Sequence, residues 1–598
     1  MKIQEFFKNN AVVADLAEAE LRALIAKTAT AYLLTQKLEA KFDFVVEHPT
    51  EESFGDYATN VAMALTKIAK KNPLEIANAI AEKISRPDLI EKVEVVSPGF
   101  INFYLKSEYY QKELQNILAK KEKYGSFEME HPQKVMIEFG QPNTHKAFHI
   151  GHLRSAISGL SVARLFENLG YAVIKTNYYG DIGMQTAKSV WGILQKGIPA
   201  DFENWDKHKR MKYINDAYAF ASENFDANEA EIRKINKEIY NKEDTENVRL
   251  YEKIKLWSLE HLNAVFANLG IIYDKQYPES SVCENALKIV ENNIGKIFQK
   301  SEGALIYNGD KDGLSSWVFR TGEGIPTYSA KDLALAFKKF EDFDLDLNIT
   351  LTSVEQTDYF KAIIKILETL DDKFKDKYLH IPFGWLLRAG KKTSSRMGNS
   401  VKGMDIIQEA NDVAKEKIKE LKDYDAEKRE KIAGVVALAG LKFLILSREF
   451  HKNINYDPQK FVSFEGFSGP YILYAFVRAQ SILKKGGVEK GEGDGFAAAP
   501  VLSARQPKIL KSEFEQNLLK WLTRYPQVAY RACAEISPHL VCNYLYELSQ
   551  KFNQFYANCP VLTASADDKQ SRLALASATA QVLKNGLSLL GIETIEEM

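Results

Sequence analysis

Two histidines, His149 and His152, stand on either side of Gly151 in a four-residue stretch of the chain. Imidazoles at this spacing can hold a metal, pack as a buried pair or contact a phosphate. The apolar run 135–137 upstream predicts a buried strand, and apolar residues recur at near-helical spacing downstream until Gly170. We therefore expect a strand-to-helix turn, where the first helical N–H groups are unpaired and Gly151 lets a ligand approach the chain. This arrangement favours phosphate binding.

A second stretch, residues 390–399, is cationic and rich in hydroxyl groups. It begins Gly-Lys-Lys-Thr-Ser-Ser-Arg, and we expect a flexible loop. Donors on such a loop can close over a polyphosphate as negative charge develops in a transition state. Taken alone, a stretch of this kind is more often a solvated turn.

The length and composition of the chain limit what these two stretches can serve. A chain of 598 residues is too long for one core, and about three to five units are expected at roughly 100–200 residues per domain. A hydrophobic fraction of 45% and a charged fraction of 27% are typical of an ordinary globular protein. The formal net charge is −1, so any nucleic-acid partner must be held by local basic patches.

The four cysteines predict free thiols in a reducing compartment. They form no C-x-x-C pair and have no accompanying histidine spacing, so we expect no protein-bound zinc or other metal and no disulfide framework. The N-terminal residues lack the apolar core of a signal peptide. The longest apolar stretch, 432–446, is interrupted by Lys442 and is too short to cross a bilayer. We expect a cytoplasmic protein with no membrane partner.

Residues 1–112 predict a small α+β unit. Its helical patterns and strand-like runs cover 12–36, 57–85, 42–46, 93–96 and 100–105. The segment 54–57 opens the second helical pattern, and Asp56 is expected to cap that helix while the neighbouring aromatic residues pack. An alternative is that this surface holds part of a large ligand.

Strands and helices alternate through residues 113–429, which predicts a parallel sheet with crossover helices. The expected strands are 135–139, 172–177, 349–353 and 379–382. The segment 186–262 is rich in charged residues and asparagine and predicts a helical insertion between the two halves of the sheet. From residue 430 long helical patterns replace the alternation, so 430–598 is expected to be an all-α domain. Its one low-complexity stretch, 486–495, indicates a flexible surface loop.

The two chemical stretches together resemble the signature pair of the class I aminoacyl-tRNA synthetases. Residues 149–152 match the HIGH sequence in every letter, and 392–396 resemble the KMSKS loop with Thr393 in place of the usual methionine. The resemblance implies that His149, His152 and Lys392 are catalytic. It implies an ATP site, with Mg²⁺ on the nucleotide, made by His149, Gly151, His152, Lys392, Ser394, Ser395 and Arg396.

Longer blocks are similar to the arginyl-tRNA synthetases in particular. They cover 54–60, 97–102, 138–155, 177–185, 328–334, 463–471 and 589–593. The resemblance implies a Rossmann-like parallel-sheet catalytic domain with a helical insertion. A small α+β domain that contacts tRNA would precede it, and a helical-bundle domain that reads the anticodon would follow.

The same resemblance places five arginine-contacting residues, Glu138, Asn143, Tyr328, Asp332 and Gln356. A planar cation with five donors requires carboxylates, and its burial without them would be costly. The two acids therefore favour a cationic substrate. Taken alone, Glu138 fits a salt bridge at a strand end, and Asp332 fits a residue favoured by a helix dipole.

Some positions depart from the family pattern. Gln141 stands where serine is usual, Ala147 where proline is usual, and Tyr359 where histidine is common. No charged contact is lost, so an active enzyme remains expected. Lys146, beside these positions, fits a contact to phosphate or tRNA as well as a surface lysine.

The activity implied by the resemblance is arginine–tRNA ligation. ATP and L-arginine would form arginyl-adenylate and pyrophosphate, and the arginyl group would pass to the 3′ adenosine of tRNA(Arg) with release of AMP. Relatives often need tRNA for the first step, and family habit favours a monomer. One alternative is a different class I ligase or nucleotidyl transferase, such as a lysine- or glutamate-specific relative; the other is a non-catalytic tRNA-binding relative. Intact histidines and Lys392 disfavour the second.

Overall fold

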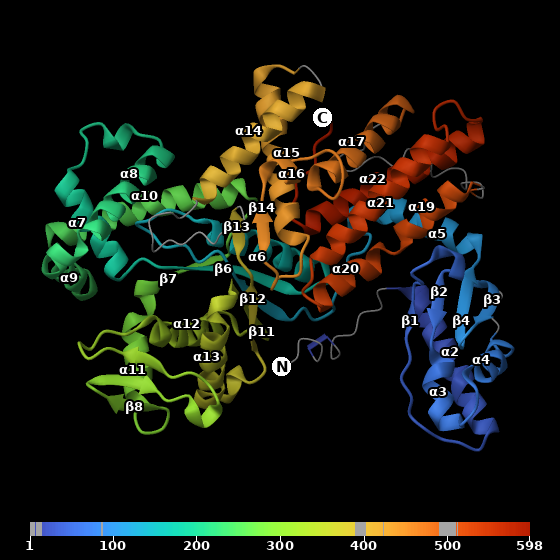
Figure 1. Cartoon of the computed structure of the whole chain (residues 1–598), viewed down its shortest axis with the longest axis horizontal. Coiled ribbons are helices and arrows are strands. Elements are labelled where there is room, and N and C mark those ends of the chain that lie inside the picture. The colour runs from blue at the N-terminus through green and yellow to red at the C-terminus, as the bar shows by residue number, and fades with distance from the viewer. Residues whose placement is uncertain are drawn as a thin grey trace.

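The computed structural model describes residues 6–7, 15–84, 88–388, 402–421, 424–488, 510 and 512–598. Figure 1 shows a small N-terminal domain, a central α/β domain and a C-terminal group of helices. This arrangement confirms the expected fold class. None of the helices within these ranges combines the length and the apolarity that a membrane span requires.

A five-stranded parallel sheet forms the centre of the middle domain, in the order β12-β11-β5-β6-β7. The strands are β5 Lys134–Glu138, β6 Ala172–Tyr179, β7 Lys275–Pro278, β11 Leu347–Ser353 and β12 Tyr378–Phe383. Four of them coincide with the apolar runs of the sequence. The short edge strand β7 does not, because it contains lysine and glutamine and has no apolar run.

The expected phosphate-binding turn lies where the strand order of the sheet reverses. From β5 the chain crosses to β6 through α6 (Ile150–Asn168), and it later reaches the other side of β5 through α12 (Tyr328–Phe343) and β11. α13 (Thr357–Leu370) then leads to β12. Because crossovers leave β5 on opposite sides, a crevice is expected at the carboxyl ends of β5 and β11, the usual ligand position in an open parallel sheet.

The three middle residues of strand β5, 135–137, are apolar because both faces of the sheet are covered. Val135 and Ile137 pack in the same core as Leu153 of α6, whereas Met136 packs on the other face with Leu333 of α12. The alternation follows from the two-residue period of a strand. It places the end of β5, and the turn after it, between two packed layers.

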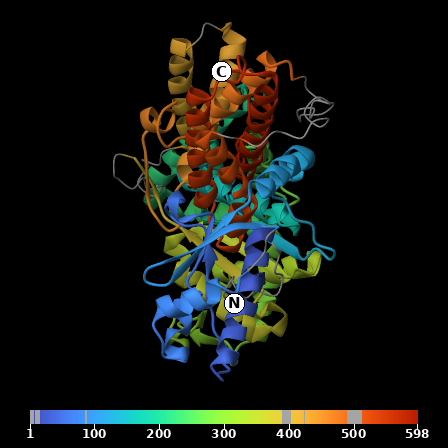
Figure 2. The same ribbon diagram turned by 90° about the vertical axis from the view of Figure 1, so that its right-hand side faces the viewer.

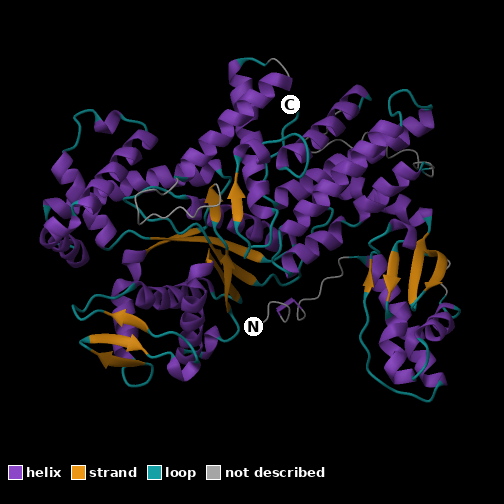
Figure 3. Ribbon diagram, in the orientation of Figure 1, coloured by secondary structure: helices purple, strands orange, loops and turns teal. Residues whose placement is uncertain are grey.

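Two insertions extend from the sheet, as Figure 3 shows. The first has an apolar core of its own and consists of α7 Met184–Lys196, α8 Lys207–Glu223, α9 Phe225–Asn241 and α10 Glu246–Asn268. The second combines a helix with an antiparallel sheet, in the elements α11 Cys283–Asn292, β8 Phe298–Ser301, β9 Ala304–Tyr307 and β10 Trp317–Arg320. The sequence pattern does not indicate this sheet, since four-residue strands are too short to show a period.

The N-terminal domain packs helices on an antiparallel sheet of order β1-β2-β4-β3. Its elements are α2 Leu16–Thr35, β1 Val46–Glu47, β2 Tyr57–Thr59, α3 Val61–Ala69, α4 Pro73–Ala81, β3 Ile90–Val96 and β4 Phe100–Leu105, followed by α5 Ser107–Lys120. The expectation of one helix over 57–85 is wrong, because Tyr57 begins a strand that pairs with β4. Asp56 consequently caps no helix; its Oδ2 accepts the N–H of Leu105 at 2.7 Å.

The C-terminal domain is helical, as expected. Its principal helices are α14 Gly403–Leu421, α15 Ala426–Leu446, α16 Pro458–Phe461, α17 Gly469–Lys485, α19 Glu513–Thr523, α20 Tyr525–Ala534, α21 His539–Asn558 and α22 Ala566–Leu589. The expected boundary at residue 430 falls inside α15. A two-stranded parallel sheet of β13 (Leu386–Arg388) and β14 (Ile454–Tyr456) joins this region to the central domain.

Ion pairs connect the N-terminal domain to the C-terminal helices. Lys520 of α19 pairs with Asp56 at 2.8 Å, and Lys551 of α21 pairs with Glu52 at 2.6 Å. Figure 2 shows the N-terminal domain below these helices. Asp56, which was the acid of the alternative ligand surface at 54–57, thus pairs with the C-terminal domain of the same chain.

Candidate active site

His149 is the N-cap of α6, and its ring closes the first turn of the helix. Its Nδ1 accepts the N–H of Gly151 at 3.1 Å and that of His152 at 3.4 Å, while Nδ1 of His152 accepts the N–H of His149 at 3.3 Å. The expectation that these helical N–H groups are free for phosphate is therefore wrong. The absence of a side chain at Gly151 leaves room for the capping ring, since a Cβ there would lie 3.0 Å from the His149 ring.

The same hydrogen bonds determine the tautomer of both rings. A neutral imidazole whose Nδ1 accepts a hydrogen bond carries its proton on Nε2, where it is a donor. Burial, together with the charge of Lys146, lowers the pKa of His149 to about 4, and burial lowers the pKa of His152 well below its usual value. The rings stack with centroids 3.5 Å apart. Two neutral Nε2–H donors thus stand side by side at the crevice.

Lys146 supplies a positive charge next to these donors. Burial lowers its pKa, and no carboxylate within the described ranges forms an ion pair with it. The neighbouring Ala147 donates its N–H to Asn215 of α8 at 3.1 Å, a bond that the proline usual at this position could not make. His145, by contrast, is fully buried, and its Nε2 lies 3.2 Å from the carbonyl of Tyr251, so it is a core residue.

The second chemical stretch lies outside the described residues. This applies to Lys392, Thr393, Ser394, Ser395 and Arg396, whose ATP contacts stay predictions. The chain after the stretch is anchored at the turn: Lys402 forms a β-bridge with His149, and the N–H of Gly403 donates to the carbonyl of Phe148 at 2.8 Å. One flank of the stretch therefore adjoins the histidines.

Glu138, at the carboxyl end of β5, already has partners inside the protein. One oxygen forms an ion pair with Lys339 of α12, and the other accepts a hydrogen bond from Gln141 at 2.9 Å. Lys339 is fully buried and Glu138 is 4% exposed. Burial has the largest single effect and lowers the pKa of Lys339, but the charge and hydrogen bond of Glu138, with the charges of Tyr378 and Asp332, together raise it above its usual value. A direct contact between Glu138 and a substrate remains a prediction.

Asp332, in the first turns of α12, is a half-buried acid near Glu138. The hydroxyl of Tyr359, on α13, donates to its Oδ2 at 2.5 Å. Burial raises the pKa of Asp332 to about 7, the hydrogen bond from Tyr359 lowers it, and the charges of Glu138 and Glu279 raise it. An acid in these surroundings is ready to bind a cation.

A cavity of about 600 Å³ brings two of the five expected arginine contacts together, Asn143 and Tyr328. Glu138 and Asp332 are not in its lining, and Gln356 is exposed on a 3-10 helix away from it. Glu279, which the sequence reasoning missed, also lines the cavity and forms an ion pair with the buried Lys331. Burial raises the pKa of Glu279, and Lys331 opposes that rise. The only local signal for Glu279 was its place directly after the unrecognised strand β7.

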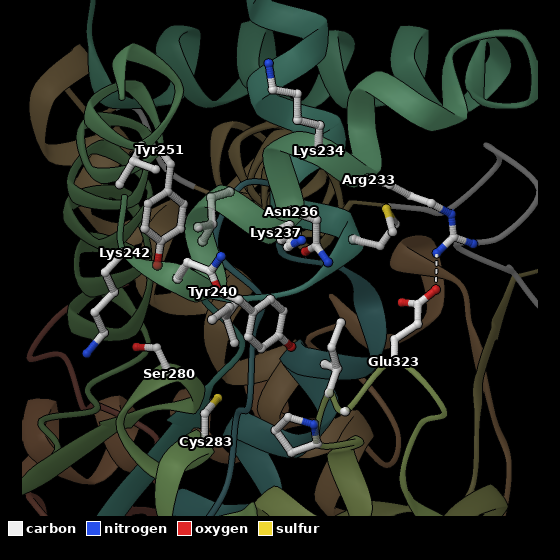
Figure 4. A pocket seen from close by; sticks show the side chains of 18 of the residues that line it. Arg233, Lys234, Asn236, Lys237, Tyr240, Lys242, Tyr251, Ser280, Cys283 and Glu323 are labelled. Atoms are coloured by element: carbon white, nitrogen blue, oxygen red, sulfur yellow. Dashed lines mark ion pairs between the residues drawn. The ribbon is translucent and has the colours of Figure 1, made fainter. Parts of the chain in front are cut away.

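A larger cavity, of about 990 Å³, adjoins the first and lies between the helical insertion and the start of α11 (Figure 4). Five cations and three carboxylates line it, together with the rings of Tyr240 and Tyr251. The cations are Arg233, Lys234, Lys237, Lys242 and Lys255. Lys331 lies 3.5 Å from the hydroxyl of Tyr240 and thereby connects the two cavities.

A third cavity, of about 440 Å³, lies in the helical domain between α17 and the end of α21. Arg478 lies over the rings of Tyr474 and Tyr556, at 4.8 and 5.4 Å from their centroids. Its Nη1 donates to Asn553 at 2.6 Å. The arrangement presents a cation and aromatic faces at one surface. Among the described residues no group of His, Cys, Asp and Glu has metal-binding geometry.

Three family models match the chain. "tRNA synthetases class I (R), catalytic domain" matches residues 113–457, "Arginyl tRNA synthetase N terminal domain" matches 17–105, and "DALR anticodon binding domain" matches 472–598. An arginine–tRNA ligase of Fusobacterium nucleatum is 32% identical over 569 residues, which cover 92% of this chain and 94% of the relative. Another, of Lactococcus lactis subsp. cremoris, is 32% identical over 580 residues and covers 95% and 99%.

Solved structures are similar over nearly the whole chain. The arginyl-tRNA synthetase of Thermus thermophilus superposes with a TM-score of 0.78 at 25% identity, covering 96% of this chain and all of that one. That of Plasmodium falciparum has a TM-score of 0.77 at 20% identity, covering 98% and 100%, which is a likeness of fold. With a HIGH turn at the sheet reversal, matching family models over most of its length and relatives 32% identical, this chain belongs to the arginyl-tRNA synthetase family, with a class I catalytic domain.

Proposed function

We propose that this chain is an arginine–tRNA ligase, which activates L-arginine with ATP and transfers the arginyl group to the 3′ adenosine of tRNA(Arg). The observation that carries the proposal is a pair of carboxylates from separate elements, Glu279 in the wall of the cavity that Asn143 also lines, and Asp332 behind that wall. Asp332 is joined to the wall by Tyr359, whose ring contacts Trp317 and Tyr328 of the lining. Asp332 and Glu279 each have one oxygen already engaged, by Tyr359 and by Lys331 respectively. Among the described residues, no donor occupies the other oxygen of either acid.

Two such acceptors suit the guanidinium of arginine. Its donors spread in a plane and can reach acceptors on two sides, whereas the ammonium of lysine is a compact point charge. Asn143, at the same cavity, offers an amide for the α-amino or carboxylate end of the amino acid. Tyr328, which is 52% exposed, offers a ring to cover it. An acidic substrate would be repelled by both carboxylates.

We assign the ATP phosphates to the HIGH turn. The Nε2–H groups of His149 and His152 donate to phosphate oxygens, and the ammonium of Lys146 adds charge beside them. Lys392, Ser394, Ser395 and Arg396 close on the β- and γ-phosphates from the neighbouring segment, whose flank bonds to Phe148. Mg²⁺ bound to the nucleotide would neutralise part of its charge.

Adenylation then requires positioning more than proton transfer. An arginine carboxylate oxygen attacks the α-phosphorus, the bond to the bridging oxygen breaks, and pyrophosphate leaves with the bonding electrons. Neutral imidazole donors stabilise the charge on the phosphates without needing to change protonation state. Removing one such preorganised donor typically raises a barrier by about 3 kcal/mol, a loss of roughly a hundredfold.

The basic cavity suits the 3′ strand of the tRNA. It combines cations for phosphates with tyrosine rings on which unpaired bases can stack. It shares Ile182 and Pro326 with the 600 Å³ cavity lined by Asn143 and Tyr328, which we call the arginine cavity. The cavity around Arg478 offers the same combination for splayed anticodon bases. Both sites are local clusters of cations, which a chain of net charge −1 needs in order to hold a nucleic acid.

The test is ATP–pyrophosphate exchange with each amino acid, with and without tRNA. We expect exchange driven by arginine, and transfer of radiolabelled arginine to tRNA(Arg). Exchange driven by lysine or another amino acid, with none by arginine even in the presence of tRNA, would contradict the proposal. Absence of exchange with every amino acid would instead favour the non-catalytic alternative.

A further inference from the structure

Tyr359 makes the one hydrogen bond to Asp332 found among the described residues. The tyrosine is 4% exposed and stands near the start of α13, whereas the acid stands on α12. The Tyr359 ring also contacts the rings of Trp317 and Tyr328, with centroids 5.1 Å from each. Both neighbours line the arginine cavity. The residue therefore contacts the acid with its hydroxyl and the aromatic wall with its ring.

This contact occurs at a position where the chain departs from its family pattern, in which histidine is common. A tyrosine hydroxyl that donates to one carboxylate oxygen restricts rotation of the carboxylate and leaves the second oxygen as the acceptor. A hydrogen bond of this kind also stabilises the ionised form of the acid. The restricted rotation and the stabilised negative charge both favour binding of a cation by the carboxylate.

We propose that Tyr359 is a positioning residue for arginine recognition: its hydroxyl holds Oδ2 of Asp332 so that Oδ1 accepts from the guanidinium. The inference rests on the proposed function. The titratable and charged groups that act on Asp332 come from α12, α13, β5, β6, β12 and the turn directly after β7. They are Tyr328, Lys339, Tyr359, Glu138, Tyr178, Tyr378 and Glu279.

The electrostatics around Asp332 give the proposal a pH signature. With its pKa raised to about 7 by burial, Asp332 is partly protonated in the empty cavity near neutral pH. Arginine binds the ionised acid, so its KM falls as pH rises through that pKa. The Tyr359 hydrogen bond lowers the pKa, and its removal moves the midpoint of the KM profile to higher pH.

The experiment compares Tyr359→Phe and Tyr359→His with the unmodified full-length protein in arginine-dependent exchange, with tRNA present, from pH 6 to 9. For Tyr359→Phe we expect an increase in KM for arginine of roughly 10-fold or more near pH 7, the range for a hydrogen bond to a charged group. The midpoint should move upward, while KM for ATP and kcat at saturating arginine change little. Tyr359→His, which restores a donor, should recover part of the loss.

The matched control is Tyr277→Phe. The hydroxyl of Tyr277 donates to Asp342 at 3.0 Å, so this variant removes the same kind of bond from the same helix α12 and the same apolar core, ten residues beyond Asp332. We expect it to leave KM for arginine and its pH midpoint unchanged. Equal effects of Tyr277→Phe and Tyr359→Phe would show a merely structural role and overturn the proposal.

Other results are equally decisive. An unchanged KM and midpoint in a folded Tyr359→Phe protein overturn the role of the hydroxyl. If Tyr359→Phe does not fold, as judged by thermal unfolding, Tyr359→Met, which also lacks the donor, takes its place, and an unchanged KM and midpoint there overturn the proposal. Failure of the unmodified protein to catalyse arginine-dependent exchange would contradict the proposed function itself, which separates the two failures.

Discussion

Replacing Lys339 by methionine removes the cation that is paired with Glu138. Lys339 is fully buried and Glu138 is 4% exposed, so water cannot solvate the charge that remains. Breaking a buried ion pair in this way typically costs about 3–5 kcal/mol of the free energy of unfolding. Gln141 still donates to the other oxygen of Glu138, which offsets part of that cost. We therefore expect a loss of about 3 kcal/mol.

A double variant separates the loss of the pair from the isolated charge. Glu138→Gln together with Lys339→Met leaves no buried charge, and it should recover most of the lost stability, since neutral replacements of a buried pair are often tolerated. The matched control is Lys175→Met. Lys175 pairs with Glu167 at 2.6 Å, but these side chains are 21% and 40% exposed, so its loss should cost less than about 1 kcal/mol.

The assay is urea-induced unfolding followed by circular dichroism, with KM for arginine measured on every folded variant. A loss below about 1 kcal/mol in Lys339→Met, or a double variant no more stable than the single one, would refute the reasoning from burial. The kinetics then locate Glu138. If Glu138 acts on Asp332 without contacting arginine itself, a folded Glu138→Gln/Lys339→Met variant should retain arginine-dependent exchange. Its KM for arginine should then rise less than that of Asp332→Asn.

Three further predictions concern the other sites. His149→Asn keeps a good helix cap but loses the ring donor, so exchange should fall by roughly a hundredfold while stability changes little, whereas His149→Ala should also lose about 1 kcal/mol of stability; equal stabilities would contradict the capping role. Arg478→Gln should weaken tRNA binding by about tenfold or more without changing exchange at saturating tRNA, as measured by filter binding; unchanged affinity would contradict the anticodon assignment. Lys237→Gln should reduce the slope of log affinity for tRNA against log salt by about 1, whereas Lys300→Gln on β8 should not; identical slopes would contradict the role of the basic cavity.

The local pattern of residues determined the parts of the site that lie close together in the chain. The apolar run 135–137, the histidines and the helical spacing after them were sufficient to predict a strand, a turn and a helix, because each depends on short-range geometry. The same holds for four strands of the central sheet and for the helical insertion. The departures Ala147 and Gln141 were visible in the sequence, but their partners, Asn215 and Glu138, were not.

Only the tertiary structure decided which side chains are satisfied and which are available. Lys339 follows Glu138 by about 200 residues, so no local period could reveal that it neutralises the acid. Glu279 reaches the arginine cavity because a short polar edge strand delivers it there. Tyr359 meets Asp332 because α12 and α13 pack together. Likewise, the ring of His149 accepts the helical N–H groups of Gly151 and His152, which the sequence pattern predicted to be free for phosphate. Hydrogen-bond satisfaction depends on atoms brought together by folding, and that is why sequence spacing alone could not settle it.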